Sequence, residues 1–313
     1  MARNLQSQIN HCVVASFRGD EGTNTSGGFG VSKHSDKIAG QKAGKIYSYE
    51  TYQNRKDIAK EFGKFMKEHH PEVKMAKDLN QLHAVEFVAK KSTEVNTNTL
   101  NNIRSQMKGL ADNINHTFKS CNVNFDTLPM QGVSNESVKT VSMSSKDYKT
   151  LIQSYNDPLS KTGAVGAQVI WASGLRAHEV CNLKGSDIKI ENGKATVHVE
   201  QGKGGRMRDV EVSDPERVQT LEQIKNYYGD SRVCDVKARS LEANISRHLK
   251  QVTTEQNYKY NACHSIRKEY SQETYDQLKS QGYSQEEAWG QVCEKLGHSS
   301  DREALFKVYI ERP

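Results

Sequence analysis

Apolar side chains recur at helical intervals through the first half of the chain. Spacings of three and four residues place such side chains on one face of an amphipathic helix, and the charged residues between them form the opposite face. The apolar positions of three successive groups are Ile58, Phe62, Phe65 and Met66, then Leu79, Leu82, Val85, Phe87 and Val88, then Leu100, Ile103, Met107, Leu110, Ile114 and Phe118. The pattern predicts a small all-α domain over residues 46–122.

Two stretches lack this periodicity. Residues 1–45 are rich in Gly, Ser, Asn and Lys, as in the run from Gly22 to Gly28, and they predict a flexible N-terminal arm with at most one short helix. Residues 123–143 contain Pro129, Gly132 and several Ser, Asn and Thr residues, which is typical of a linker. A second domain is therefore expected over residues 144–313.

The second domain begins and ends with helical patterns, but a short central section alternates with the period of a β-strand. The runs 195–201 and 209–212 flank the glycine-rich segment 202–205, which is the pattern of a β-hairpin. The predicted fold class is mainly α with a small β-sheet or hairpin.

Composition narrows the function only slightly. The formal net charge is +6, which is mild for a protein that binds nucleic acid. The six cysteines are scattered, with no C-x-x-C pair and no His/Cys cluster at metal-ligand spacing, so reduced thiols and no metal are expected. No segment has the apolar length of a membrane span or of a signal peptide, which predicts a cytoplasmic location.

Five short motifs in the second domain carry the candidate chemistry. In chain order they are Gly174-Leu-Arg176-Ala-His-Glu179, Gly202-Lys203-Gly-Gly-Arg206, His264-Ser-Ile-Arg267, Leu296-Gly-His298-Ser-Ser300 and Val308-Tyr309-Ile310. Each motif alone has an ordinary explanation as a surface ion pair, a solvated turn, a chance helical pair, a turn histidine or a core tyrosine. Their joint order is much less expected by chance.

This order of motifs resembles that of the tyrosine recombinases, the family of phage-type integrases, and the resemblance covers roughly residues 50–313. By resemblance, residues 46–122 would be a helical SAM-like core-binding domain and residues 144–313 the catalytic domain. The two would form a C-shaped clamp on DNA. The spacing from His298 to Tyr309 is longer than is usual in that family, yet Tyr309 is the only tyrosine after Tyr283.

The resemblance also implies a role for each motif residue. Tyr309 would attack a backbone phosphate and form a covalent 3′-phosphotyrosine, so that religation needs neither ATP nor any other cofactor. Arg176 and Arg267 would stabilise charge on the non-bridging oxygens, because guanidinium is planar and always charged. The remaining expectations are phosphate contacts and proton transfer by His264 and His298, protonation of the leaving 5′ oxygen by Lys203, and support of the arginines or a histidine by Glu179.

The expected partner is double-stranded DNA. Basic residues on the helices of the first domain are candidates for phosphate contacts, namely Lys56, Lys60, Lys64, Arg104 and Lys108. Exchange of strands between two duplexes needs four coordinated cleavages, so self-assembly, as a tetramer in the synapse, is expected, with accessory DNA-bending or directionality proteins as further partners. By comparison with compact relatives of the family, the glycine-rich arm and the unusual C-terminus favour the integrase of a mobile element over a chromosome-dimer resolvase. Such a protein would act on the nucleoid.

Two other functions remain open at this stage. A type IB topoisomerase would use the same Arg, Lys, His and Tyr chemistry to nick and reseal one strand. A non-catalytic DNA-binding relative would keep the fold, but it would be expected to lack at least one catalytic residue, and none is missing from this sequence.

Overall fold

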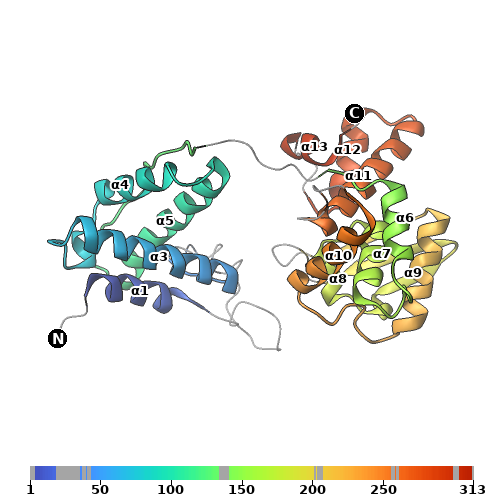
Figure 1. The fold of residues 1–313 in the computed structure, drawn as a ribbon, viewed down its shortest axis with the longest axis horizontal. Helices are drawn as coiled ribbons and strands as arrows, with labels where there is room; N and C mark the ends of the chain where they lie inside the picture. Colours follow the sequence, from blue (N-terminus) through green and yellow to red (C-terminus); the bar gives the residue numbers. More distant parts are fainter. Residues whose placement is uncertain are drawn as a thin grey trace. The chain divides into compact units, whose positions relative to one another are not determined.

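The chain forms two compact units, Met1–Ser137 and Val138–Pro313, in a computed structural model (Figure 1). The division lies inside the segment 123–143 that the sequence predicts as a linker. The structure describes residues 4–18, 36, 40, 44–133, 141–200, 202, 207–254, 258, 261–298 and 303–311.

The first unit is helical around one apolar core. Its elements are α1 (Leu5–Ser16), α3 (Tyr49–His69), η2 (Ala76–Asp78), α4 (Gln81–Ser92) and α5 (Thr97–Thr117). Polar side chains mark the helix starts: Ser48 accepts from the backbone of α3, Asn80 from that of α4 and Asn96 from that of α5. Such caps satisfy N–H groups that have no partner within the helix. The predicted helices of residues 46–122 are therefore present.

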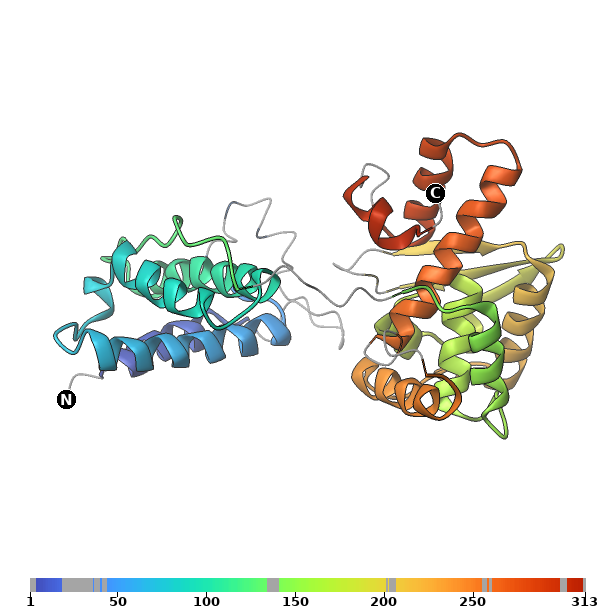
Figure 2. The same ribbon diagram turned by 45° about the horizontal axis from the view of Figure 1, so that its top comes forward.

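Helix α1 corrects the prediction of a flexible arm over residues 1–45. It packs against α3 and α5 and lies alongside α3 in both views (Figures 1 and 2). Ile9, Cys12 and Val13 are fully buried, because they fall on one face of the helix together with Leu5. The one short helix expected in this region is present as α1. The expectation of a flexible arm is wrong for Leu5–Ser16, because this helix packs into the core; its apolar spacing was obscured by the glycine-rich sequence that follows it. Residues 19–35, 37–39 and 41–43 of the predicted arm lie outside the described residues.

The core of the first unit also extends beyond residue 122. Val123, Phe125 and Leu128 are buried in it, and the Phe125 ring meets the Phe62 ring edge-on with centroids 5.8 Å apart. The first part of the predicted linker 123–143 is thus structural. Isolated apolar residues among Asn, Asp and Pro show no period, so sequence patterning could not assign them to the core.

The second unit is built around helix α7. Its elements are α6 (Ser145–Gln153), α7 (Thr162–Ser173), α8 (Ala177–Asn182), η3 (Gly185–Asp187), β1 (Ile188–Glu191), β2 (Lys194–Val199), β3 (Arg208–Val212), α9 (Pro215–Tyr228), α10 (Ala238–Val252), α11 (Ala262–Ser280), α12 (Gln285–Lys295) and α13 (Glu303–Tyr309). Helix α7 is apolar on nearly all sides and contacts α8, α9, α10, α11 and β3, as expected of a central helix.

The β section is a three-stranded antiparallel sheet in the order β1-β2-β3. Strands β2 and β3 correspond to the predicted hairpin, whereas β1 was not predicted. Asn192 and Gly193 connect β1 to β2 with φ values of 51° and 73°, which is the Asn-Gly turn that favours a two-residue hairpin. The predicted fold class, mainly α with a small β-sheet, is confirmed.

Truncation of Ile9 tests whether α1 belongs to the first unit. The change Ile9→Ala should lower the free energy of unfolding of that unit by about 2–5 kcal/mol, because Ile9 is fully buried. Both tryptophans, Trp171 and Trp289, lie in the second unit. Urea titration should therefore move the far-UV circular dichroism transition and leave the tryptophan fluorescence transition in place.

The matched control for this test is Val14→Ala. Val14 lies on the same helix but is 47% exposed, so its truncation should cost about 0.5 kcal/mol or less. Equal stability of the two variants would mean that α1 does not pack as described.

Candidate active site

Arg176 is positioned by the way α7 ends. Gly174 terminates the helix with φ 65°, a conformation that glycine adopts without strain. A Cβ atom at this position would lie 2.4 Å from the Tyr270 ring, so close packing also requires glycine. The chain then turns, and Arg176 is the N-cap residue of α8. Its backbone N–H donates to Glu179 Oε2 at 2.8 Å.

Glu179 holds two arginines. Its side chain is fully buried, and its Oε1 lies 3.2 Å from Arg176 Nη1. Arg208 donates to both carboxylate oxygens at 2.9 Å, which is a bidentate ion pair. Burial opposes ionisation of Glu179, but the hydrogen bonds from Arg208 and the Arg176 backbone and the charges of both arginines together lower its pKa to about 2. Glu179 is therefore a carboxylate at neutral pH.

Arg208 was missed by sequence reasoning. It lies on β3 in alternation with Val210 and Val212, whose side chains are buried. An arginine on the inward-facing side of a strand needs a buried acidic partner, and this was the available signal. Arg208 also approaches Gly297, where an added Cβ would meet the guanidinium at 2.9 Å. It therefore connects strand β3 to the segment that carries His298.

Arg267 lies on α11 and is only 2% exposed. Its Nη1 donates to the carbonyl of Gly174, and its Nη2 donates to the carbonyl of Leu296 at 2.7 Å. The guanidinium carbon is 5.8 Å from the centre of the Tyr309 ring. Burial lowers the pKa of Arg267 to about 10, so the group remains charged at neutral pH. The two carbonyl contacts fix its orientation.

His264 precedes Arg267 by one helical turn on α11. Its ring meets the Tyr309 ring at 68°, with centroids 5.4 Å apart. Burial, followed by the positive charges of Arg267, Lys268 and Arg176, lowers the pKa of His264 to about 4. His264 is consequently neutral near pH 7, the state in which an imidazole can accept a proton.

His298 directly follows Gly297, whose φ of 69° ends the turn after α12. Its Nε2 is 3.1 Å from Arg176 Nη2 and 3.4 Å from the Tyr309 hydroxyl. His298 thus contacts Arg176, near the start of the second unit, and Tyr309, near its end.

Tyr309 is the last residue of α13, near the C-terminal end of the chain (Figure 1). It is 6% exposed and belongs to a small apolar cluster with Trp289 and Leu296. Its ring is bordered by Trp289, His264 and His298. The hydroxyl therefore faces His298, while the ring is held by its neighbours.

The structure brings six of the seven sequence-predicted motif residues together. These are Arg176, Glu179, His264, Arg267, His298 and Tyr309. The seventh, Lys203, lies outside the described residues. The candidate DNA-binding residues belong to the first unit: Lys56, Lys60 and Lys64 lie on α3, and Arg104 and Lys108 lie on α5.

Salt bridges occupy some of these basic residues. Lys64 lies 3.8 Å from Glu68, and Lys108 lies 4.0 Å from Asp126. The Lys56 ammonium sits 5.3 Å from the centre of the Tyr52 ring. Lys60 is exposed on the same helix.

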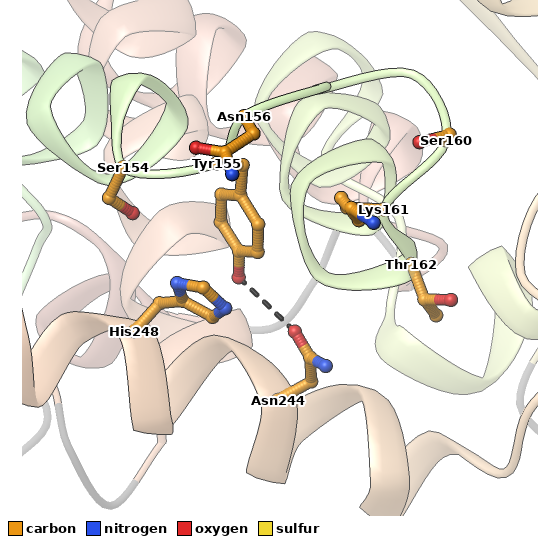
Figure 3. A pocket seen from close by; sticks show the side chains of 8 residues that line it. All are labelled: Ser154, Tyr155, Asn156, Ser160, Lys161, Thr162, Asn244 and His248. Carbon is orange, nitrogen blue, oxygen red and sulfur yellow. Dashed lines mark hydrogen bonds between the residues drawn. The ribbon is translucent and has the colours of Figure 1, made fainter.

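Other candidate features were also located. Within the described ranges, no group of three or more His, Cys, Asp or Glu side chains could hold a metal ion, and no helix has the length and apolarity to cross a membrane. None of the six cysteines, all of which the structure describes, is in a disulfide. A cavity between the α6–α7 connection and α10 is lined by Tyr155, Lys161, Asn244 and His248 among others, and none of the motif residues borders it (Figure 3).

The fold and the site define a class of protein in which a histidine contacts a tyrosine hydroxyl and an arginine, while a second arginine and a second histidine border the tyrosine ring. Residues 142–310, more than half of the chain, match the model of the phage integrase family. The chain belongs to this family, which confirms the resemblance seen in its sequence.

Individual known proteins agree with this assignment. The chain is 42% identical over 59 residues to the tyrosine recombinase XerA of Pyrococcus furiosus, a stretch that spans 19% of this chain and only 18% of that relative's length. A post-cleavage complex of the XerH site-specific recombinase with a palindromic difH substrate is similar in fold, with a TM-score of 0.63 and 14% identity over 98% of this chain and 91% of that one. A lambda integrase tetramer bound to a Holliday junction gives a TM-score of 0.58 and 15% identity over 96% and 79% of the two chains.

The ion pairs of Glu179 predict a specific dependence of stability on pH. Its pKa in the folded protein, about 2, lies below the ordinary value of 4.5, so its ionisation stabilises the fold above about pH 4.5 and this contribution is lost as pH falls toward 2. The loss should be on the order of 3 kcal/mol at its full extent, because one pKa unit corresponds to about 1.4 kcal/mol. Urea unfolding followed by tryptophan fluorescence measures it in the second unit.

In Glu179→Gln this part of the acid destabilisation should be absent. The control Glu294→Gln removes an exposed carboxylate of α12 and should keep the wild-type pH dependence. If both variants lost stability with pH like the wild type, the buried ion pairs would not determine the ionisation of Glu179.

Proposed function

We propose that this protein is a site-specific DNA recombinase that cleaves and rejoins DNA strands through a covalent 3′-phosphotyrosine on Tyr309. The observation that carries the proposal is the convergence on one tyrosine hydroxyl: His298 Nε2 lies 3.4 Å from it, and Arg176 Nη2 lies 3.1 Å from the same nitrogen. Arg267 and His264 border the tyrosine ring. A phosphate placed at the hydroxyl would meet positive charge on more than one side.

In the proposed reaction the Tyr309 oxygen forms a bond to phosphorus, and the bond from phosphorus to the 5′ oxygen breaks. A histidine accepts the phenolic proton, and Lys203 gives a proton to the departing 5′ oxygen. Arg176 and Arg267 stabilise the charge that develops on the non-bridging oxygens. Religation is the reverse step, with a 5′ hydroxyl as the nucleophile, and it uses the energy kept in the phosphotyrosine bond.

The contacts of Arg267 suit this task. A guanidinium has five N–H donors, and two of them are directed to the carbonyls of Gly174 and Leu296. These bonds orient the group before substrate binds, so little reorganisation accompanies the reaction. Glu179 and Arg208 do the same for Arg176, since they fix the turn that carries it.

Double-stranded DNA is the proposed substrate, and Lys56, Lys60, Lys64, Arg104 and Lys108 are proposed to contact its phosphates. Known similar proteins support this, because XerH was solved on a difH substrate and lambda integrase as a tetramer on a Holliday junction. We extend the proposal to a tetramer in the synapse, to accessory DNA-bending or directionality proteins, to action on the nucleoid in the cytoplasm, and to integration or excision of a mobile element.

Tyr309→Phe tests the nucleophile. The wild-type protein should form a denaturation-resistant adduct with members of a pool of nicked duplexes of randomised sequence, because the nick lets the cleaved end diffuse away. The Tyr309→Phe variant should retain DNA binding and form no adduct, since it keeps the ring and loses only the hydroxyl. Tyr283→Phe, which changes a tyrosine outside the site, should react like the wild type. An adduct from the Tyr309→Phe variant on a denaturing gel would refute the assignment.

Lys203→Ala tests the general acid. Loss of the proton donor should slow cleavage by about 10²- to 10⁴-fold on ordinary DNA. A substrate with sulfur at the 5′-bridging position has a better leaving group and should be cleaved by this variant at nearly the wild-type rate. Arg267→Ala should stay slow on both substrates, because sulfur at the bridge does not relieve charge on the non-bridging oxygens. A defect in Lys203→Ala that sulfur fails to rescue would make Lys203 a phosphate contact instead.

A further inference from the structure

Tyr309 is carried by a short helix that needs tertiary support. Helix α13 has seven residues, and isolated helices of this length do not form in water. The described part of α13 packs on α11, the helix that carries His264 and Arg267 (Figure 2). The position of the tyrosine hydroxyl relative to these residues therefore depends on contacts between the two helices.

Glu311, two residues after the tyrosine, ties the end of this segment to α11 by two contacts and to Ser142 by a third. Its Oε1 lies 2.5 Å from Lys268 Nζ on α11 and accepts from the Ser142 backbone N–H at 3.1 Å. Its own backbone N–H donates to Gln272 Oε1, also on α11, at 2.9 Å. The side chain of Lys268 is only 6% exposed, so the ion pair is shielded from water on one side.

The distance along the chain makes these contacts relevant to the tyrosine. Two residues span at most about 7 Å, so an anchored Glu311 leaves the Tyr309 backbone little freedom. Ile310, between them, is 4% exposed and its N–H donates to the Phe306 carbonyl at 2.8 Å. Lys268 directly follows Arg267 in the sequence, and Glu311 lies two residues after Tyr309. The ion pair between Lys268 and Glu311 therefore joins the backbone next to the arginine to the backbone next to the tyrosine.

We infer that Glu311 is a positioning residue for the nucleophile: its contacts with Lys268, Gln272 and Ser142 hold Tyr309 at reacting distance from the phosphate that Arg267 binds. The effect of Glu311 on the reaction rate rests on the proposed function, whereas its effect on the position of Tyr309 does not. A misplacement of about 1 Å at a reacting atom can cost on the order of 10²-fold in rate, so a contact that sets this distance affects catalysis without touching the substrate.

The first test needs no DNA. In the full-length protein, Glu311→Ala should accelerate amide hydrogen exchange of residues 303–311 by about tenfold or more, because it removes the acceptor of two bonds that hold α13. Glu311→Gln keeps an acceptor without the charge and should give an intermediate rate. Glu303→Ala changes an exposed carboxylate at the start of the same helix and should leave exchange of this segment unchanged. Unchanged exchange in Glu311→Ala would overturn the inference.

A double-mutant cycle tests the partner. If Glu311 acts through Lys268, the pair of changes Glu311→Ala and Lys268→Met should accelerate exchange by less than the combined effect of the two single changes. Strictly additive effects of the two changes would remove Lys268 from the account and contradict the ion pair as the anchor.

The second test uses the nicked duplex that the wild-type protein captures from the randomised pool. Glu311→Ala should bind this duplex with unchanged affinity and form the adduct about 10- to 100-fold more slowly, with Glu311→Gln between them. A purely structural role would leave the adduct rate of the folded variant equal to that of Glu303→Ala, and this result would overturn the inference. If the wild-type protein captured no duplex, the proposed function would be refuted. The hydrogen-exchange test needs no DNA, so it would still show whether Glu311 holds Tyr309 in place.

Discussion

The buried carboxylate of Glu179 is the group on which the arrangement of the motif residues in the second unit depends. It accepts from Arg176 on the turn before α8 and from Arg208 on the sheet, and Arg208 in turn packs against Gly297 beside His298. Removing one member of such a buried set leaves a charge without compensation, which costs several kcal/mol. Glu179 thus fixes the turn before α8 relative to strand β3, and through Arg208 it also fixes the segment that carries Gly297 and His298.

Helix α11 provides the second constraint. Arg267 reaches from it to the carbonyls at the ends of two other helices, Gly174 after α7 and Leu296 after α12. Both carbonyls belong to turns that precede a site residue, Arg176 in one case and His298 in the other. A buried arginine bound to both turns therefore couples the shape of the site to the core of the domain, and the burial that lowers its pKa also shields its charge from solvent.

Electrostatics within the site have a consistent direction. Burial lowers the pKa of His264 most, and the positive charges of Arg267, Lys268 and Arg176 lower it further. His264 is therefore neutral at physiological pH. A cluster of fixed positive charge with a neutral imidazole is suited to an anionic transition state, because the charge is provided by groups that do not titrate near pH 7. The energetic cost of gathering these cations is offset in part by Glu179 and, at the tyrosine segment, by Glu311.

Sequence alone determined the class of fold, the helical periodicity of both units and the β2–β3 hairpin, because these depend on local spacing. It also singled out the motif residues by their order along the chain. It did not determine that α1 and residues 123–128 belong to the first core, since a short apolar pattern among glycine and polar residues resembles a loop. Nor did it identify Arg208, Lys268 and Glu311 as members of ion pairs and hydrogen bonds next to the motif residues. Those assignments depend on partners that lie from 29 to more than 160 residues away in the chain. Only the tertiary structure brings such partners together, because burial converts ordinary charged residues into pairs that must satisfy one another.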